Sequence, residues 1–218
     1  MRLVRVVKYW FKLLYTDNCI LKQILINDVN WVSQINAILL NNGFADVWMY
    51  PYAVDVNAFL TVFKQKIKDT YVTNWRANMN VSSRLWLYQE FKTDFVLEKY
   101  LVKIVNPKLR KSLTRFRCVS HKLCIETGRH GKNRRERQER ICMYCNLNDI
   151  EDGYHFLLVC PLYKDERKLY IKKYFWNYPS VYKCITLLSS ENINVVRNLA
   201  KYIQSALYIR TNTQYDIV

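Results

Sequence analysis

The chain has 218 residues, of which 34 are Lys or Arg and 18 are Asp or Glu, so its formal net charge is +16. Half of the residues are hydrophobic, which excludes an intrinsically disordered chain, and only four Gly and four Pro argue against a loop-rich or all-β fold. No apolar run approaches the ~18 residues that are needed to span a bilayer, so we expect no integral membrane protein.

Hydrophobic periodicity in the first part of the chain is mainly helical. It predicts helices over residues 3–15 and 30–40, followed by a packed turn over residues 44–51. The first segment is basic enough to resemble a mitochondrial presequence, but we favour an ordinary amphipathic helix. Asp55 can cap a long helix that runs to about Asn78.

The second part of the chain continues the same pattern. Further helices are predicted near Ser82, over residues 94–104, from Pro107 as a first-turn proline, over residues 165–175 and over residues 192–210. We expect an extended segment over residues 121–127 and a basic loop or helix start over residues 128–140. The sequence therefore predicts an all-α, multi-helix protein, divided into a helical region (1–112), a basic and cysteine-containing segment (113–175) and C-terminal helices (176–218).

The positive charge is concentrated between Lys103 and Arg140, where 13 basic residues face three acidic ones. Such a block is typical of a nucleic-acid-binding surface, although it can also be a solvated face that keeps a protein soluble. Guanidinium groups grip phosphate with two parallel hydrogen bonds. The residues that we expect to contact phosphate are Arg115, Arg117, Arg129, Lys132, Arg134, Arg135, Arg137 and Arg140.

Four soft metal ligands follow this block in the pattern C-x2-C-x9-H-x4-C, formed by Cys142, Cys145, His155 and Cys160. Three thiolates and one imidazole complete a tetrahedral Zn²⁺ site with no open position, so the site would be structural rather than catalytic. We therefore predict one structural Zn²⁺ in a small CCHC zinc-knuckle insertion. Tyr144, inside the knuckle, is a candidate for stacking on an unpaired base.

Other interpretations of these four residues stay open. The C-x2-C pair can be a redox motif, but the βαβ context of such motifs is absent. Disulfides are disfavoured because no signal peptide is evident and the cysteine count is seven. The four residues can also be unrelated, with Cys145 and Cys160 simply buried. We expect the remaining cysteines to be core residues and His121 to be structural or a phosphate contact; these cysteines are Cys19, Cys118, Cys124 and Cys184.

Three runs of the sequence resemble the C-terminal region of non-LTR (LINE-type) retrotransposon polyproteins, which follows the reverse transcriptase and carries a CCHC zinc knuckle. They are residues 113–129 (LTRFRCVSHKLCIETGR), 140–146 (RICMYCN) and 150–163 (IEDGYHFLLVCPLY). Residues 43–48 and 59–65 also resemble the helical part of that tail. One departure is Gly153, where the family commonly has an acid; we expect the ligands to be intact and the local helix start to be looser.

The resemblance implies that Cys142, Cys145, His155 and Cys160 are the zinc ligands of a module that holds element RNA or target DNA for a reverse transcriptase. We expect no catalysis, because the polymerase needs paired carboxylates and the stretch from Tyr52 to Asp55 lacks the second acid. The chain would then be a detached tail of such a polyprotein.

We also expect a nuclear or cytoplasmic location, not secretion, and no membrane partner. An alternative function is a helical protein-interaction scaffold, in which the aromatic-rich helices between Trp10 and Tyr100 dock on a polymerase domain or another partner.

Overall fold

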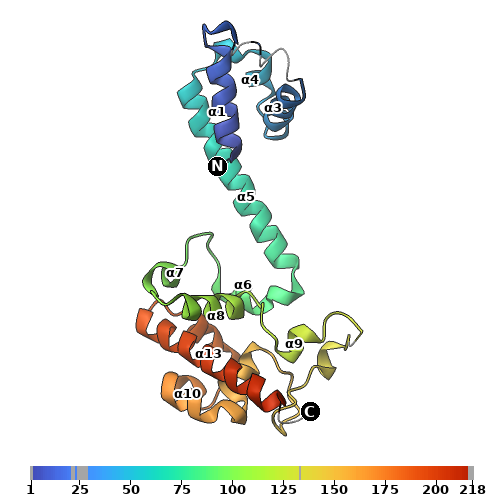
Figure 1. Cartoon of the computed structure of the whole chain (residues 1–218), viewed down its shortest axis with the longest axis vertical. Coiled ribbons are helices and arrows are strands. Elements are labelled where there is room, and N and C mark those ends of the chain that lie inside the picture. The colour runs from blue at the N-terminus through green and yellow to red at the C-terminus, as the bar shows by residue number, and fades with distance from the viewer. Residues whose placement is uncertain (1, 21–22, 24–28, 133, 216–218) are drawn as a thin grey trace. The chain divides into compact units, whose positions relative to one another are not determined.

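The computed structural model describes residues 2–20, 23, 29–132 and 134–215 (Figure 1). Most of these described residues are helical, and among them the only β-type pairing is an isolated bridge between Ile141 and Ile150. The predicted all-α class is therefore confirmed. The chain forms two compact units, Met1–Asn78 and Met79–Val218.

The first unit is a small helical cluster held together by aromatic side chains. Its elements are α1 (Arg2–Leu14), α3 (Val29–Asn41), α4 (Ala45–Met49), η1 (Pro51–Ala53) and most of α5 (Val56–Val81). Trp10 and Phe11 of α1 are buried with Phe59 and Phe63 of α5, and the Trp10 ring stacks on Trp48 with centroids 5.5 Å apart. Burial of such rings supplies much of the driving force for a unit of this size.

The start of α5 is as predicted, since the Asp55 carboxylate accepts hydrogen bonds from the backbone N–H of Asn57 at 2.9 Å and of Ala58 at 3.0 Å. The preceding turn is different. Residues 44–51 contain the short helix α4, because Val47 is buried in the core and Trp48 packs against it.

The second unit contains the remaining elements. They are η2 (Ser83–Leu85), α6 (Trp86–Phe91), α7 (Lys99–Lys103), α8 (Pro107–Arg117), α9 (Cys124–Thr127), η3 (Arg137–Glu139), the π-helical turn η4 (His155–Val159), η5 (Pro161–Tyr163), α10 (Lys164–Tyr170), α11 (Lys173–Trp176), α12 (Val181–Leu188) and α13 (Ile193–Tyr215). The long helix α13 packs against α8, α10 and α7 (Figure 1). Pro107 occupies the first turn of α8 as predicted.

One continuous core runs through the second unit from Leu87 to Ala206. It includes Leu113 of α8 and Leu199 of α13. The predicted boundaries at 112/113 and 175/176 fall inside α8 and α11, and a cut at either place would divide this core. The structure instead separates the units after Asn78.

Three predicted elements of the second unit differ from those observed. The helix expected over residues 94–104 is only Lys99–Lys103, where Tyr100 is buried. The segment expected to be extended over residues 121–127 contains α9, whose first N–H is bonded to a buried carboxylate. The helix expected over residues 165–175 is interrupted at Ile171, which leaves the helical conformation and enters the core.

No helix among the described residues is long and apolar enough to cross a membrane.

Candidate metal centre

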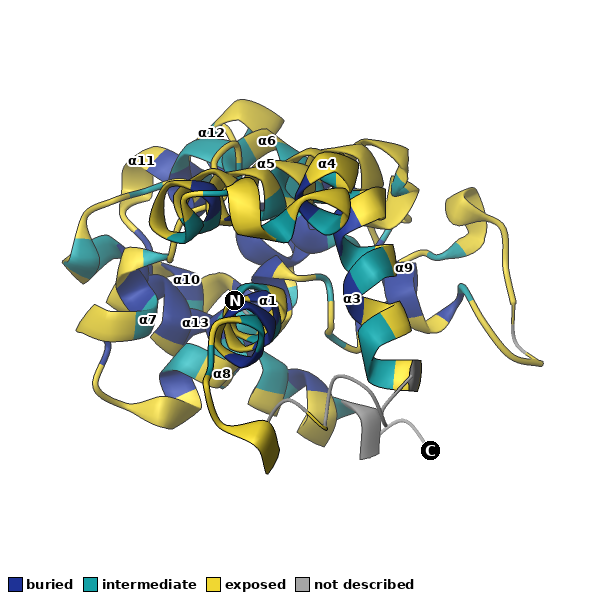
Figure 2. Cartoon of the chain, turned by 90° about the horizontal axis from the view of Figure 1, so that it is seen from above, coloured by how far each residue is buried: buried dark blue, intermediate teal, exposed yellow. Residues whose placement is uncertain are grey.

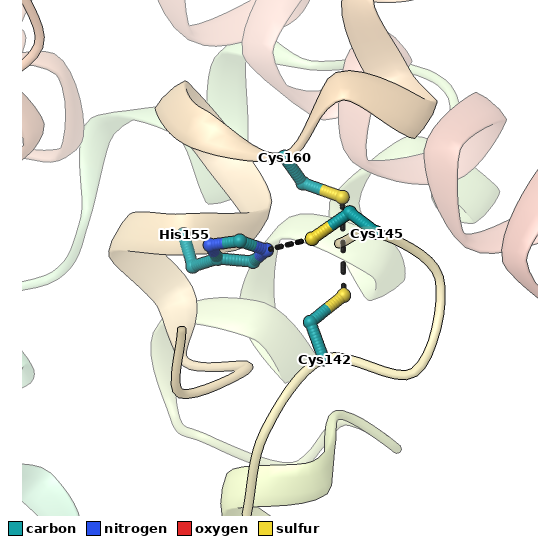
Figure 3. Close-up of side chains that lie close together, drawn as sticks. All are labelled: Cys142, Cys145, His155 and Cys160. Carbon is teal, nitrogen blue, oxygen red and sulfur yellow. Dashed lines mark hydrogen bonds between the residues drawn. The ribbon is translucent and has the colours of Figure 1, made fainter. Parts of the chain in front are cut away.

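Cys142, Cys145, His155 and Cys160 converge in the second unit (Figure 3). Their four potential ligand atoms all lie within 4.8 Å of one another. The Sγ atoms of Cys142 and Cys160 are 3.9 Å apart, and Cys145 Sγ is 3.4 Å from His155 Nε2. This group can hold one metal ion.

The first two ligands lie in a loop that is closed like a hairpin. The Cys142 N–H donates to the Asp149 carbonyl at 2.8 Å, and the Glu151 N–H donates to the Arg140 carbonyl at 2.9 Å. Asn148 turns the chain with φ of 54°, a conformation that asparagine adopts more readily than most residues. These backbone bonds and the turn at Asn148 place Cys142 and Cys145 on the same loop, facing the other two ligands.

The other two ligands are set by the π-helical turn η4. The Cys160 N–H donates to the His155 carbonyl at 2.8 Å, an i→i+5 bond that closes the turn and brings both residues to one side. In an α-helix, residues five apart point about 140° away from each other. The Asp152 carboxylate accepts the His155 N–H at 3.0 Å, so the start of this helical segment is capped.

Helices α10 and α13 support the π-helical turn from outside. Buried Arg167 donates from Nε to the Leu157 carbonyl at 2.9 Å and from Nη2 to the Cys160 carbonyl at 2.7 Å. The Tyr202 hydroxyl donates to the Phe156 carbonyl at 2.6 Å. These bonds satisfy carbonyls that the irregular turn leaves without helical partners, which holds Cys160 in position.

A buried ion pair joins the metal loop to α13. Arg210 donates to both oxygens of Glu151, at 2.7 Å from Nε and 2.8 Å from Nη2. Glu151 is fully buried and also accepts the Cys124 N–H at 2.7 Å. Burial alone would lower the pKa of Arg210, but the hydrogen-bonded Glu151 carboxylate raises it above its usual value.

Hydrogen bonding and burial shift the pKa values of the three thiols in different directions. The hydrogen bond to Cys160, together with burial, raises the pKa of the Cys142 thiol to about 12, and the same hydrogen bond lowers the pKa of Cys160. Burial raises the pKa of Cys145. A cation bound here would hold the thiolate forms, so binding would release protons.

His155 presents Nε2 to the other ligands, whereas its Nδ1 faces Asp149, with a separation of 3.6 Å to Oδ2. In the described residues this buried Nδ1 has no hydrogen-bond partner. A carboxylate in this position orients the ring of a metal-bound histidine once the contact shortens to a hydrogen bond.

The basic segment (residues 129–140) follows α9, and its described residues, 129–132 and 134–140, lie at the surface in loop conformation apart from the short turn η3; Figure 2 shows this region mainly in yellow. Lys132, Arg134, Arg135 and Arg137 are exposed. Arg129 and Arg140 are half-buried and are used internally. Arg129 forms an ion pair with Glu126 at 2.7 Å, and Arg140 donates to the carbonyl of Ile125 at 3.2 Å and to that of Arg135.

Two further side chains that were predicted to contact nucleic acid, Arg117 and Tyr144, are engaged in contacts within the protein. Arg117 is only 8% exposed, lies 3.3 Å from a Glu98 oxygen and covers the rings of Phe91 and Tyr100. Tyr144 is half-buried, and the Arg210 guanidinium lies 4.9 Å from its ring centre. Neither side chain is free to meet a phosphate or a base as the sequence predicted. Arg115, in contrast, is exposed on α8.

The prediction that the remaining cysteines are core residues holds for two of the four. Cys124 and Cys184 are buried as predicted, but Cys19 and Cys118 are exposed. The His121 ring packs on Phe116, and burial lowers the pKa of His121 to about 4.

Gly153, the departure from the family pattern, is closely packed. A Cβ at this position would lie 3.2 Å from Leu87 Cδ2, so the core leaves little room for a larger residue. The Asp152 cap next to it keeps the helix start in place, contrary to the expected loosening.

Comparison of the chain with protein-family models, curated proteins and solved structures gives no match. The resemblance to retrotransposon tails is a matter of the motif residues alone, and no comparison adds to it.

The residues that position the site were not predicted from the sequence; they are chiefly Glu151, Arg167 and Arg210. A signal existed for Arg210, which follows the inward residues Ile203 and Ala206 at helical spacing on α13. Glu151 offered none, because its partner lies 59 residues away.

Proposed function

We propose that this chain is a non-catalytic nucleic-acid-binding module built around one structural Zn²⁺. The observation that carries the proposal is the geometry of the four ligand atoms. Tetrahedral zinc with ordinary bond lengths places two sulfurs about 3.8 Å apart and a sulfur and a nitrogen about 3.6 Å apart. Two of the separations, 3.9 Å and 3.4 Å, are close to these values, and all four ligand atoms lie within 4.8 Å of one another, so binding would draw the group slightly together.

The donor set favours zinc over the other common metals. Three thiolates exclude the hard cations Mg²⁺ and Ca²⁺, which prefer oxygen ligands. With four protein ligands the ion has no open position, so its contribution is to the fold of residues 141–161, a CCHC zinc knuckle. Structural zinc contributes on the order of 10 kcal/mol to the folding of small modules.

The nucleic-acid part of the proposal rests on charge and exposure. Lys132, Arg134, Arg135 and Arg137 are exposed on the loop that leads into the first ligand, Cys142. Folding of the knuckle on a bound ion would fix the end of this loop and so the direction in which the guanidinium groups point. By resemblance to retrotransposon tails, the bound molecule is element RNA or target DNA.

Metal analysis of the purified protein tests the zinc site. We expect one zinc per wild-type chain and close to none in Cys142→Ser. Cys118→Ser, which removes an exposed thiol of the same unit, is the matched control and should retain the metal. A folded wild-type protein purified without chelator and free of metal would disprove the zinc site.

Binding of single-stranded RNA and duplex DNA across a salt series tests the second part. Arg134→Ala with Arg135→Ala should weaken binding of all sequences similarly and lower the log–log salt slope by up to ~2. Lys172→Ala with Lys173→Ala removes the same charge from exposed positions elsewhere in the unit and should change the slope little. Equal effects of the two pairs would remove the assignment to the basic segment.

A second candidate function is protein docking through the first unit. Met49, Tyr50 and Tyr52 form an exposed apolar stretch around η1, each about two-thirds exposed. Such patches on small units are frequent interaction sites. Solution mass measurement with and without a reverse transcriptase domain distinguishes this function, since nucleic-acid binding alone predicts no mass increase with that domain.

A further inference from the structure

The described residues include a second basic surface, outside the basic segment and the metal centre. A groove of about 680 Å³ lies between α8 and α13 in the second unit. Four exposed cations line it, and its lining residues include no Asp or Glu. They are Lys108, Lys111, Arg115 and Lys122.

The sequence of α8 explains why these side chains gather on one wall. Leu109, Leu113 and Phe116 are buried in the core, so the basic residues between them face outward. Lys108, Lys111 and Arg115 follow at spacings of three and four residues, which places them on one face of the helix. With a rise of 1.5 Å per residue the three span roughly 10 Å.

That span suits a nucleic-acid backbone. Successive phosphates of one strand of duplex DNA advance about 3.4 Å along the axis, so roughly 10 Å covers about three of them. Neutral donors complete the lining, including Ser112 on α8 and Gln204 on α13. A concave basic wall above a low-dielectric core also strengthens the local field for an anion.

Among the described residues, no acidic side chain neutralises the cations of this wall. In the described part of the chain, none of Lys108, Lys111, Arg115 and Lys122 takes part in an ion pair. Arg210, which also lines the groove, differs because Glu151 already neutralises it. Four uncompensated charges in one groove repel one another, and a bound polyanion removes that repulsion.

We propose that the groove between α8 and α13 is a second nucleic-acid site, which takes the sugar–phosphate backbone of one strand along Lys108, Lys111 and Arg115. This inference rests on the proposed function and adds a site to it. It places Arg115, which the sequence predicts to contact phosphate, in the groove and apart from the basic segment. Backbone phosphates are the same at every position of a strand, so the groove would not distinguish one base sequence from another.

The test is a fluorescence anisotropy salt series with a 20-nucleotide single-stranded RNA, its DNA equivalent and a 20-base-pair duplex. The groove variant is Lys108→Ala with Lys111→Ala and Arg115→Ala. We expect its salt slope to fall by ~2–3 with at least one of the probes, and its Kd at 0.1 M salt to rise at least about tenfold. The probe most affected identifies the bound strand type.

Two controls separate the groove from general charge. Lys164→Ala with Lys172→Ala and Lys173→Ala removes three exposed lysines elsewhere in the unit and should change the slope by much less. Zinc content and thermal midpoint should be unchanged in both triple variants, because all the replaced side chains are exposed.

A reverse design adds charge instead of removing it. Thr211→Glu places an acid on the α13 wall of the groove without deleting any cation and should weaken binding severalfold. Asn198→Glu, at an exposed site about 20 Å further along the same helix, should not.

The failures of the two proposals are distinguishable. If the groove variant and Thr211→Glu behave like their controls while Arg134→Ala with Arg135→Ala lowers the slope, the groove inference is overturned and the proposed function stands. If the wild-type chain binds none of the three probes at low salt, both proposals fall.

Discussion

Replacing Arg210 by methionine should destabilise the second unit strongly, even when the metal ligands are untouched. The substitution keeps an unbranched apolar stem but removes the guanidinium group, which leaves the fully buried carboxylate of Glu151 without its counter-charge. Two charge-assisted hydrogen bonds, of 2.7 Å and 2.8 Å, are lost together. Breaking a buried pair from one side costs about 3–5 kcal/mol, and loss of the guanidinium from the Tyr144 ring adds to it.

The measurement is urea unfolding at pH 7 with one equivalent of zinc, combined with hydrogen exchange of the α13 amides to identify the transition of this unit. Arg197→Met is the matched control, because Arg197 is exposed on the same helix and its effect should lie within about 0.5 kcal/mol. The double variant Glu151→Gln with Arg210→Met should recover much of the loss, since Gln still accepts the Cys124 N–H.

The decisive quantity is the coupling energy between Glu151 and Arg210. A double-mutant cycle should give at least about 2 kcal/mol between residues 151 and 210. A cost below about 1 kcal/mol for Arg210→Met would refute the stabilising role of the Glu151–Arg210 ion pair, because the metal loop would then not depend on α13 for its position.

Three further predictions concern single residues. Asp149→Ala should lower zinc affinity about 10–100-fold, measured by chelator competition, because the His155 ring loses the carboxylate that faces Nδ1; Asp165→Ala, at an exposed site, is the control and an equal loss there would contradict the assignment. The free energy of unfolding of the wild-type protein should fall by up to about 3 kcal/mol relative to that of His121→Gln as pH falls from about 6.5 to about 4, because the unfolded chain takes up a proton that the half-buried His121 resists. Parallel pH–stability curves for the two proteins would show that His121 is not held neutral. Val119→Gly should stabilise the chain by about 1 kcal/mol in urea unfolding, since Val119 has φ of 53° after α8; Val181→Gly, at an exposed helical site, should do the opposite.

Local sequence signals predicted the regular parts of the fold. The apolar periodicity of α1 and α13, the Asp55 cap of α5 and the Pro107 start of α8 each depend on neighbours within a few residues. The spacing of the four ligands likewise predicted which side chains would meet.

Features that depend on distant partners were missed or misread. Arg117 looked like an exposed phosphate contact, but Glu98 and the Phe91 ring remove it from solvent. The π-helical turn at His155–Val159 depends on Arg167 and Tyr202, which satisfy its carbonyls from α10 and α13. No local pattern in a single sequence shows such partners.

The π-helical turn also makes the backbone hydrogen-bond pattern from His155 to Cys160 critical. If the same residues formed an ordinary α-helical turn, the Cys160 side chain would point about 140° away from that of His155, and the two could not share one ion. Conservative replacements of Phe156 or Leu158 leave the i→i+5 bond in place and would be tolerated far better than a change that restores regular α-helical bonding. Tolerance to mutation here is therefore governed by the backbone conformation of the turn more than by the side chains inside it.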